Sequence, residues 1–148
     1  MPVSIPLICP RSVRLLAKPD FVDAVVPAEE VCGVPINEAF LGSCNNGRLD
    51  DLRVGASVLK GRKVADGVRF LVVPASQEIY LQAMEEGLIQ IFMESGAIVM
   101  NPNCSVCWGS CQGVIGEGET LISTGTRNFK GRAGHRDSFV YLASCRNR

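Results

Sequence analysis

The amino-acid sequence predicts an α/β protein, a three-layer α/β/α sandwich built on a mainly parallel sheet. Short apolar segments alternate along the chain with segments of helical periodicity, which is typical of a sheet with helices on its faces. The segment 68–73 is continuously apolar and ends at Pro74, as expected of a parallel strand buried on both faces. The 148 residues favour a single domain, 1–148, that is long enough to bury a core.

The first predicted unit is a strand at 39–41, ending at Gly42, followed by a helix. Asp50 and Asp51 fall in the first turn of this helix, where carboxylates suit the positive end of the helix dipole. Gly61 is expected to end it. The apolar positions at helical spacing are Leu49, Leu52, Ala56 and Leu59.

The second unit is the strand at 68–73 and a helix with Ser76 as its N-cap. The helical pattern continues over 88–93 until Gly96 interrupts it, and 97–100 is predicted to be a strand. Weaker strands are expected at 120–123 and 139–142. The apolar face of the helix after Ser76 comprises Ile79, Tyr80, Ala83 and Met84.

Charge and hydropathy exclude several classes of protein. The fifteen basic and fifteen acidic side chains cancel, so nothing indicates a nucleic acid or an anionic membrane as partner. No apolar run approaches the roughly 20 residues that a membrane-spanning helix needs. The stretch 3–9 is broken by Pro6 and lacks a preceding positive charge, which makes it a poor signal peptide. We therefore expect a soluble, cytoplasmic protein.

Three cysteines form the most informative pattern in the chain. Cys104 and Cys107 make a C-x-x-C, which places two thiolates within reach of one metal atom or cluster, and Cys44 can join them through the fold. The cysteine count of seven is odd, which argues against a disulfide scaffold. Spacing alone leaves two sites open: an iron-sulfur cluster on three thiolates, and a four-thiolate zinc site that also uses Cys111.

The expected elements give these cysteines a common location. Cys44 follows one predicted strand and precedes a helix, and the C-x-x-C follows another strand. Ligands in open α/β sheets bind outside the carboxyl ends of the strands. A helix N-terminus would favour the thiolate of Cys44, while Gly42 and Gly47 would allow the backbone to approach a cluster closely.

Three blocks of sequence resemble the aconitase superfamily, in particular the large subunit of 3-isopropylmalate dehydratase. The blocks are FLGSCNNGRLDDLRVGASVLKGRK at 40–63, NPNCSVCWG at 101–109 and GEGETLISTGTRNFKGRAG at 116–134. The resemblance runs from about 17 to 143. Because family large subunits are much longer, we expect this chain to be a fragment of one.

The resemblance implies a hydro-lyase that dehydrates and rehydrates a hydroxy di- or tricarboxylic acid such as 3-isopropylmalate, as in leucine biosynthesis. Its cofactor would be a 4Fe-4S cluster held by Cys44, Cys104 and Cys107, with one iron left open to act as a Lewis acid. Arg127 and Arg132 match the family's substrate-binding arginines, since a guanidinium can hold a carboxylate through two hydrogen bonds.

The sequence departs from the family pattern at three positions. Asn45 stands where threonine is usual, Gly125 where serine is common, and Thr126 where asparagine is common. The family's base comes from a small subunit or swivelling domain, and its other acid-base residues come from N-terminal regions that are not recognisable here. We therefore assign no catalytic residue, and we expect a small subunit and the remaining large-subunit domains as partners.

Other readings of the same residues stay open. The substrate could be that of a homoaconitate- or dimethylmalate-type enzyme. The chain could also be a non-catalytic zinc- or cluster-binding module, or a remnant that folds and binds nothing. We expect His135 to lie in an exposed loop, and Trp108 and Phe129 to be packing residues near the site. The remaining cysteines are expected to be incidental or core thiols: Cys9, Cys32, Cys111 and Cys145.

Overall fold

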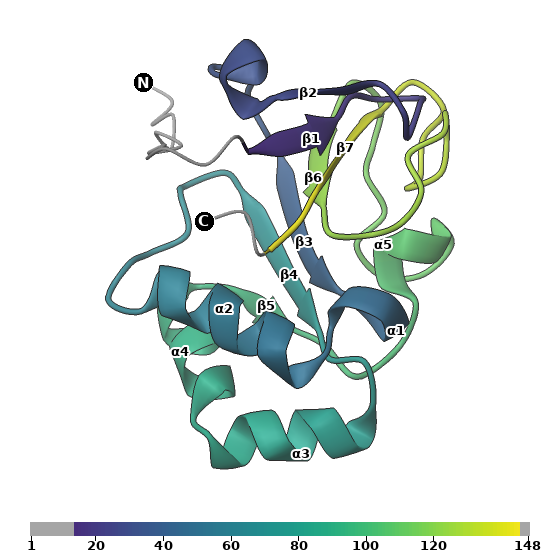
Figure 1. The fold of residues 1–148 in the computed structure, drawn as a ribbon. Coiled ribbons are helices and arrows are strands. Elements are labelled where there is room, and N and C mark those ends of the chain that lie inside the picture. The colour runs from purple at the N-terminus through teal and green to yellow at the C-terminus, as the bar shows by residue number, and fades with distance from the viewer. Residues whose placement is uncertain (1–13, 146–148) are drawn as a thin grey trace.

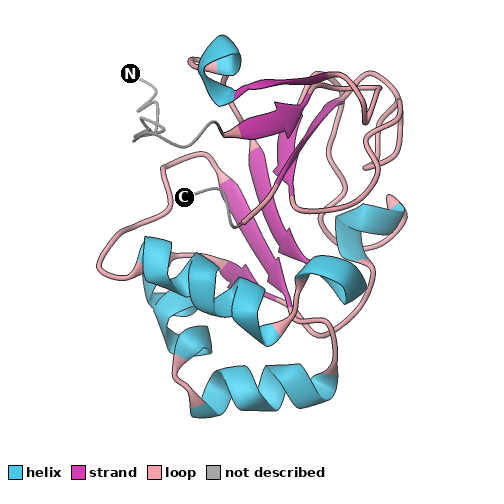
Figure 2. Cartoon of the chain, viewed as in Figure 1, coloured by secondary structure: helices cyan, strands magenta, loops and turns pink. Residues whose placement is uncertain are grey.

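The computed structural model describes residues 14–145, which form a seven-stranded mixed sheet with helices packed against it (Figures 1 and 2). The strand order is β2-β1-β7-β6-β3-β4-β5. The strands are β1 (Leu15–Ala17), β2 (Val25–Pro27), β3 (Glu38–Gly42), β4 (Arg69–Val73), β5 (Ile98–Val99), β6 (Thr120–Ser123) and β7 (Phe139–Ala143). The helices are η1 (Ala28–Val31), α1 (Ser43–Asn46), α2 (Leu49–Leu59), α3 (Gln77–Glu85), α4 (Leu88–Ser95) and α5 (Ser105–Trp108).

The centre of the sheet is parallel. β3 pairs in parallel with both β4 and β6, β5 extends the sheet beyond β4, and β7 extends it beyond β6. Only β1 pairs antiparallel, with β7 on one side and β2 on the other. The predicted α/β class with a mainly parallel sheet is confirmed, whereas the β1–β2 hairpin was not predicted.

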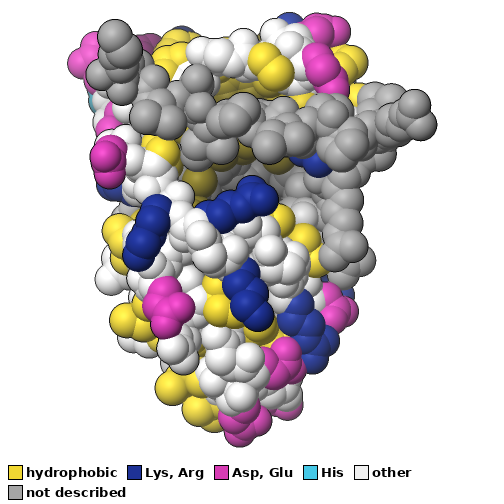
Figure 3. Space-filling view, turned by 90° about the vertical axis from the view of Figure 1, so that its left-hand side faces the viewer, with side chains coloured by type: hydrophobic (Ala, Val, Ile, Leu, Met, Phe, Trp, Pro, Cys, Tyr) yellow, Lys and Arg dark blue, Asp and Glu magenta, His cyan; other side chains and the backbone are white. Residues whose placement is uncertain are grey.

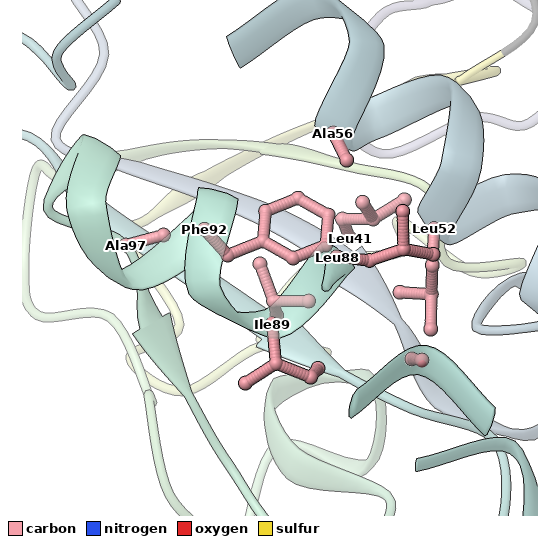
Figure 4. Packing of buried hydrophobic residues seen from close by; sticks show 9 residues of the cluster. Leu41, Leu52, Ala56, Leu88, Ile89, Phe92 and Ala97 are labelled. Carbon is pink, nitrogen blue, oxygen red and sulfur yellow. The ribbon is translucent and has the colours of Figure 1, made fainter. Parts of the chain in front are cut away.

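One face of the sheet is covered by α2, α3 and α4 (Figure 1). Leu41 of β3 and Val72 of β4 project toward this layer, where Leu52 of α2 and Phe92 of α4 meet them. Figure 4 shows the Phe92 ring between the helices and the sheet, at the centre of this cluster. The period of the apolar residues in α2 and α4 thus matches the face that they bury.

The opposite face is covered mainly by loops. Phe40, Leu71 and Val73 project from the central strands and pack against Val106 of α5 and Ile115 in the loop beyond it. The third layer of the predicted sandwich is therefore built from the long connections around β6, with the single turn of α5 as its helix. The core on this side depends on loop residues, which carry no helical period in the sequence.

The helix boundaries follow the signals in the sequence. Ser76 caps α3 by accepting a hydrogen bond from the Ile79 N–H (3.2 Å). Gly61 adopts a positive φ of 75° just after α2, as expected at a helix C-terminus. The prediction for Met84 is wrong, because its side chain is 56% exposed. Gly87, with a positive φ, separates α3 from α4.

In Figure 3 several basic side chains lie near one another across the middle of the face, with acidic side chains above and below them. This distribution agrees with the zero net charge of the chain. Among residues 14–145, no helix is long and apolar enough to cross a membrane.

A network of side-chain ion pairs lies at the amino-terminal edge of the parallel strands. The Arg69 guanidinium donates to Glu38 Oε2 (2.9 Å) and to both carboxylate oxygens of Glu119 (2.9 and 2.7 Å). Hydrogen bonds from Arg69 and from the Gly116 N–H lower the pKa of Glu119 to about 2. Burial dominates at Glu38, whose side chain is 0% exposed, and raises its pKa despite the contact with Arg69.

We expect Phe92→Ala to lower the free energy of unfolding by about 3–5 kcal/mol, because it removes a fully buried ring and leaves a cavity. The neighbouring Met93 is 65% exposed, so Met93→Ala is the matched control and should change stability by less than about 0.5 kcal/mol. Urea denaturation followed by circular dichroism measures both. Equal losses in the two variants would contradict the packing in Figure 4.

The network predicts how stability depends on pH. Because the folded-state pKa of Glu119 lies below its ordinary value of 4.5, its contribution is present above pH 4.5 and is lost as the pH falls toward about 2. In Glu119→Gln this contribution to the loss of unfolding free energy at acidic pH should disappear. Glu38 acts in the opposite direction: because its pKa is raised in the folded state, its protonation at acidic pH stabilises the fold. Glu38→Gln removes this gain, so the free energy of unfolding should fall more steeply as the pH is lowered. Urea titrations from pH 2 to 7 test this; parallel curves for both variants and the wild type would contradict it.

Candidate metal centre

The loops that follow β3 and β6 are tied together by Thr124. Its N–H donates to the Phe40 carbonyl (3.0 Å), and its Oγ1 accepts from the Gly42 N–H (3.0 Å). The Asn46 side-chain amide donates to the Thr124 carbonyl. These bonds hold α1, which carries Cys44, against the start of the loop that leads to the arginines.

Cys44 lies exposed on α1, directly after β3. The turn is pressed against the end of β4: a Cβ atom added at Gly42 or Gly47 would lie 2.2 or 2.4 Å from the Val73 carbonyl oxygen. Only glycine allows so close an approach at these two positions. The close approach observed at Gly42 and Gly47 is to the end of β4, while their approach to a cluster stays a prediction.

Cys104 and Cys107 lie at the start and within α5, five residues or more beyond β5. Ser105 fixes this loop: its Oγ donates to the Gln112 carbonyl (2.8 Å), and its N–H donates to the Asn103 side chain. Cys104 is exposed and Cys107 is partly buried. A Cβ atom at Gly125 would lie 3.8 Å from Cys107 Sγ, so α5 adjoins the same loop that Thr124 ties to α1.

Both cysteine-bearing turns contain a buried serine with a positive φ. Ser43, just before Cys44, has φ 66°, and Ser105, just after Cys104, has φ 44°. Non-glycine residues rarely adopt this conformation, and such residues cluster at functional sites. Two of the three non-glycine residues with a positive φ among residues 14–145 therefore lie in the turns that carry the candidate ligands; the third is Asp20, in the β1–β2 turn.

The structure brings the cysteine segments to one edge, but the side chains are not gathered into a ready-made ligand set. Among residues 14–145, no group of three or more His, Cys, Asp and Glu side chains lies close enough to hold a metal ion. The described cysteines are free thiols. Their placement therefore agrees with the predicted edge of the sheet, while the assignment of Cys44, Cys104 and Cys107 as ligands stays a prediction.

The two candidate substrate-binding arginines differ in environment. Arg127 is exposed and donates from Nη1 to the neighbouring Thr126 carbonyl (2.8 Å). Arg132 is partly buried, with its guanidinium carbon 5.4 Å from the centre of the Phe129 ring, and its Nε is buried without a hydrogen-bond partner among the described residues. The Gly109 backbone packs closely against the Arg132 carbonyl: a Cβ atom added at Gly109 would lie 2.0 Å from the Arg132 carbonyl oxygen. This contact joins the arginine loop to the end of α5.

Sequence reasoning missed the residue that anchors the arginine loop. Asn128 is buried, and its amide donates to the carbonyls of Lys18 (2.6 Å) and Phe21 (3.2 Å). Its own carbonyl accepts from the Asp20 N–H (3.0 Å). A single asparagine thereby connects the loop to the β1–β2 turn more than a hundred residues away, a contact for which the local sequence offers no signal.

Several minor expectations can now be assessed. His135 lies exposed in a loop, as predicted. Trp108 and Phe129 are 58% and 50% exposed, so the prediction that they are packing residues is wrong for the described part of the chain. Cys32 and Cys111 are exposed and do not belong to the core, whereas Cys145 is partly buried against the helical layer, 3.2 Å from Asp51. Cys9 lies outside the described residues.

Comparison with known proteins agrees with the resemblance in the motifs. The aconitase family (aconitate hydratase) matches residues 17–146. The 3-isopropylmalate dehydratase large subunit 2 of Archaeoglobus fulgidus is 51% identical over 132 residues, 89% of this chain and 32% of that protein. The methanogen homoaconitase large subunit of Methanocaldococcus jannaschii is 51% identical over 129 residues, 87% of this chain and 31% of that protein.

A mainly parallel sheet with two cysteine-bearing turns and an arginine loop at its carboxyl edge thus defines an α/β domain with a candidate metal-binding edge. The chain belongs to the aconitase family. It spans about a third of the length of the curated relatives that it matches.

The contact between Gly109 and Arg132 can be tested with alanine. Gly61 and Gly109 have nearly the same positive φ, 75° and 77°, but a Cβ at Gly61 meets nothing within 4 Å. We expect Gly61→Ala to cost about 1 kcal/mol from the left-handed backbone alone. Gly109→Ala should cost a further 1–3 kcal/mol or so, because the Arg132 loop has to move. Thermal unfolding measures the difference; equal losses would contradict the close contact.

Proposed function

We propose that this chain is a single domain, 1–148, of a hydro-lyase large subunit, and that it holds a 4Fe-4S cluster through Cys44, Cys104 and Cys107. The observation that carries the proposal is the meeting of the α1 turn, α5 and the arginine loop around Thr124 and Gly125. These are the three segments whose sequences resemble the family motifs. Similarity of about 50% to proteins named as dehydratase and homoaconitase large subunits supports the same reading.

The chemistry of the donor set fits an iron-sulfur cluster. The three sulfurs are free thiols that lie on two turns at one edge of the sheet, with no histidine among them. Thiolates are the usual protein ligands of such clusters. When bound, a cluster on three protein ligands supplies a Lewis-acidic iron for the removal and return of a hydroxyl group.

The arginine loop would bind the substrate's carboxylates. Arg127 projects into solvent beside the turn, and the unpartnered Nε of Arg132 is a donor that a carboxylate can satisfy. Arginine holds a carboxylate in a fixed plane through paired hydrogen bonds. The class of substrate is therefore a hydroxy di- or tricarboxylic acid such as 3-isopropylmalate, and the similarity to a homoaconitase large subunit supports a homoaconitate-type substrate as the alternative.

The chain supplies binding groups but no assigned acid or base. Because it spans about a third of its relatives, we propose that the remaining large-subunit domains and a small subunit complete the active site. The isolated chain should then bind a cluster and turn over no substrate.

A non-catalytic zinc module remains the alternative in a different class. Cys111 is exposed and follows Cys107 by four residues, so it is available as a fourth thiolate. A zinc site would need Cys111, whereas the proposed cluster does not. This difference makes Cys111 the discriminating residue.

Anaerobic reconstitution with iron and sulfide, followed by analysis of iron, sulfide and zinc, tests the proposal. We expect about four irons and four sulfides per chain in the parent protein. Cys107→Ser should lose most of this iron, because a ligand is gone, and Cys111→Ser should retain it.

The outcomes separate the two readings. Zinc with little iron, lost equally in Cys107→Ser and Cys111→Ser, would overturn the cluster and favour the zinc module. Conversion of isopropylmalate by the reconstituted chain alone would overturn the proposal that other domains complete the site. Protein of unchanged metal content and stability after reconstitution would indicate a fold that binds nothing.

A further inference from the structure

A groove of about 540 Å³, here called the edge groove, opens beside the edge strand β5. Its size falls in the range of small-molecule sites in proteins. Glu38 and Arg69, the first residues of β3 and β4, line it, together with residues of β5 and of the loops on either side of α5. Cys44, by contrast, follows the carboxyl end of β3.

Glu38 contributes an unsatisfied acceptor to the edge groove. Its side chain is fully buried, and its Oε2 accepts a hydrogen bond from Arg69 Nε (2.9 Å). Its Oε1 is also buried, and no group among residues 14–145 donates to it. A buried carboxylate oxygen without a hydrogen bond is costly, because it has lost its water and gained no partner. An N–H group of a ligand in the groove would remove this cost.

The Gly113 backbone lies against this oxygen. A Cβ atom added at Gly113 would lie 3.6 Å from Glu38 Oε1 and 2.1 Å from Leu71 Cδ1. The neighbours Gln112 and Val114 are exposed, so the turn packs against the sheet mainly through its glycine. A ligand that donates to Oε1 therefore has to displace the Gly113 turn, and the backbone at 112–114 should respond to binding.

Arg69 brings hydrogen-bond donors to the same groove. Its guanidinium donates to Glu38 through Nε and to Glu119 through Nη1 and Nη2. Since a guanidinium has five N–H donors, these three bonds leave N–H groups for an acceptor on a ligand. When both carboxylates are ionised, the network carries one excess negative charge. The groove therefore suits a ligand that carries a cation as well as an acceptor.

The remaining wall is apolar. Leu71 of β4 and Ile98 of β5 are partners in the parallel register, so their side chains project from the same face of the sheet. Leu71 is buried under the loop layer, whereas Ile98 is 49% exposed. Met100, just beyond β5, lines the groove with them. An aliphatic chain that packs on Ile98 and Met100 would remove this apolar surface from water.

We propose that the edge groove binds an α-amino acid with an aliphatic side chain. The ammonium donates to Glu38 Oε1, the carboxylate accepts from the remaining N–H groups of Arg69, and the side chain packs on Ile98 and Met100. An amine alone would leave the Arg69 donors unused, and a carboxylate alone would leave Oε1 unsatisfied and add negative charge. The inference goes beyond the proposed function, since it requires neither a cluster nor another domain.

The test is a two-dimensional NMR titration of the metal-free, reduced chain at pH 7 with L-norleucine, a straight-chain aliphatic amino acid. We expect saturable amide shifts concentrated at residues 98–101 and 112–114. Pentylamine lacks only the carboxylate and hexanoate lacks only the ammonium, so each should bind at least about tenfold more weakly. Glycine, which lacks the aliphatic chain, should also bind more weakly than norleucine.

Glu38→Gln is the decisive variant. The glutamine carbonyl can still accept from Arg69 Nε, which leaves an NH₂ group in the place of Oε1, facing the ligand's ammonium. The affinity for norleucine should fall at least about tenfold. Glu119→Gln is the matched control: Glu119 binds the same arginine but does not line the groove, so this variant should not weaken binding.

Ile98→Ala changes an exposed side chain, so it tests the apolar wall without a burden on folding. It should weaken norleucine binding about threefold. Should Glu38→Gln fail to fold, this variant and the analogue series still decide the outcome.

Unchanged norleucine affinity in a folded Glu38→Gln protein, or shifts that do not concentrate at 98–101 and 112–114, would overturn the proposal. Pentylamine binding as tightly as norleucine would overturn the role of Arg69, and hexanoate binding as tightly would overturn that of Glu38. Equal affinities for glycine and norleucine would overturn the role of the apolar wall.

Discussion

Thr124 makes the interaction on which the candidate site depends. Its backbone N–H continues the β6 to β3 ladder by one residue, while its side chain and carbonyl receive hydrogen bonds from the α1 turn. This geometry requires β3 and β6 to be parallel and in the observed register, with Phe40 opposite Ser123. A shift of one residue would turn Thr124 to the other face and release the turn that carries Cys44. The sheet register therefore sets the position of the Cys44 turn in the candidate metal centre.

The two strained serines follow from the same constraint. Ser43 and Ser105 adopt left-handed conformations, and each is held there by packing, since both are buried. A cost of roughly 1–3 kcal/mol for each is sustained only where the surroundings over-determine the backbone. Here the surroundings are the end of β4, which Gly42 and Gly47 approach, and the Gln112 carbonyl that Ser105 bonds. The strained turn at Ser43 is thus supported by the buried end of β4, and the one at Ser105 by the loop that follows α5.

Much of the fold was predictable from the sequence, and the reason lies in the elements themselves. β3, β4 and α2 to α4 are long enough for apolar periodicity, and Ser76 and Gly61 mark ends through local chemistry. β1, β2 and the single turns α1 and α5 are three or four residues long and carry no period. Their positions depend on distant partners, as Asn128 illustrates by joining the arginine loop to the first hairpin. For the same reason the motifs identified the cysteine turns, while the contact between Gly109 and the Arg132 loop emerged only from the tertiary structure.

The arrangement of charge around the centre explains why the chain would depend on other domains for chemistry. Removing a proton from carbon requires a base with a suitable pKa placed at the reacting atom. The acids of the described chain near α1 are otherwise engaged: Asp50 binds Arg53, and Asp51 lies buried beside Cys145. His135 is exposed in its loop, where its Nδ1 accepts from the Asp137 N–H. What remains at the centre is thiols and arginines, groups that can bind a metal cluster and anions. Under the proposed function, the described residues would supply the groups that bind cluster and substrate, and a base from another domain would approach from the side on which Arg127 and the Cys44 turn face solvent.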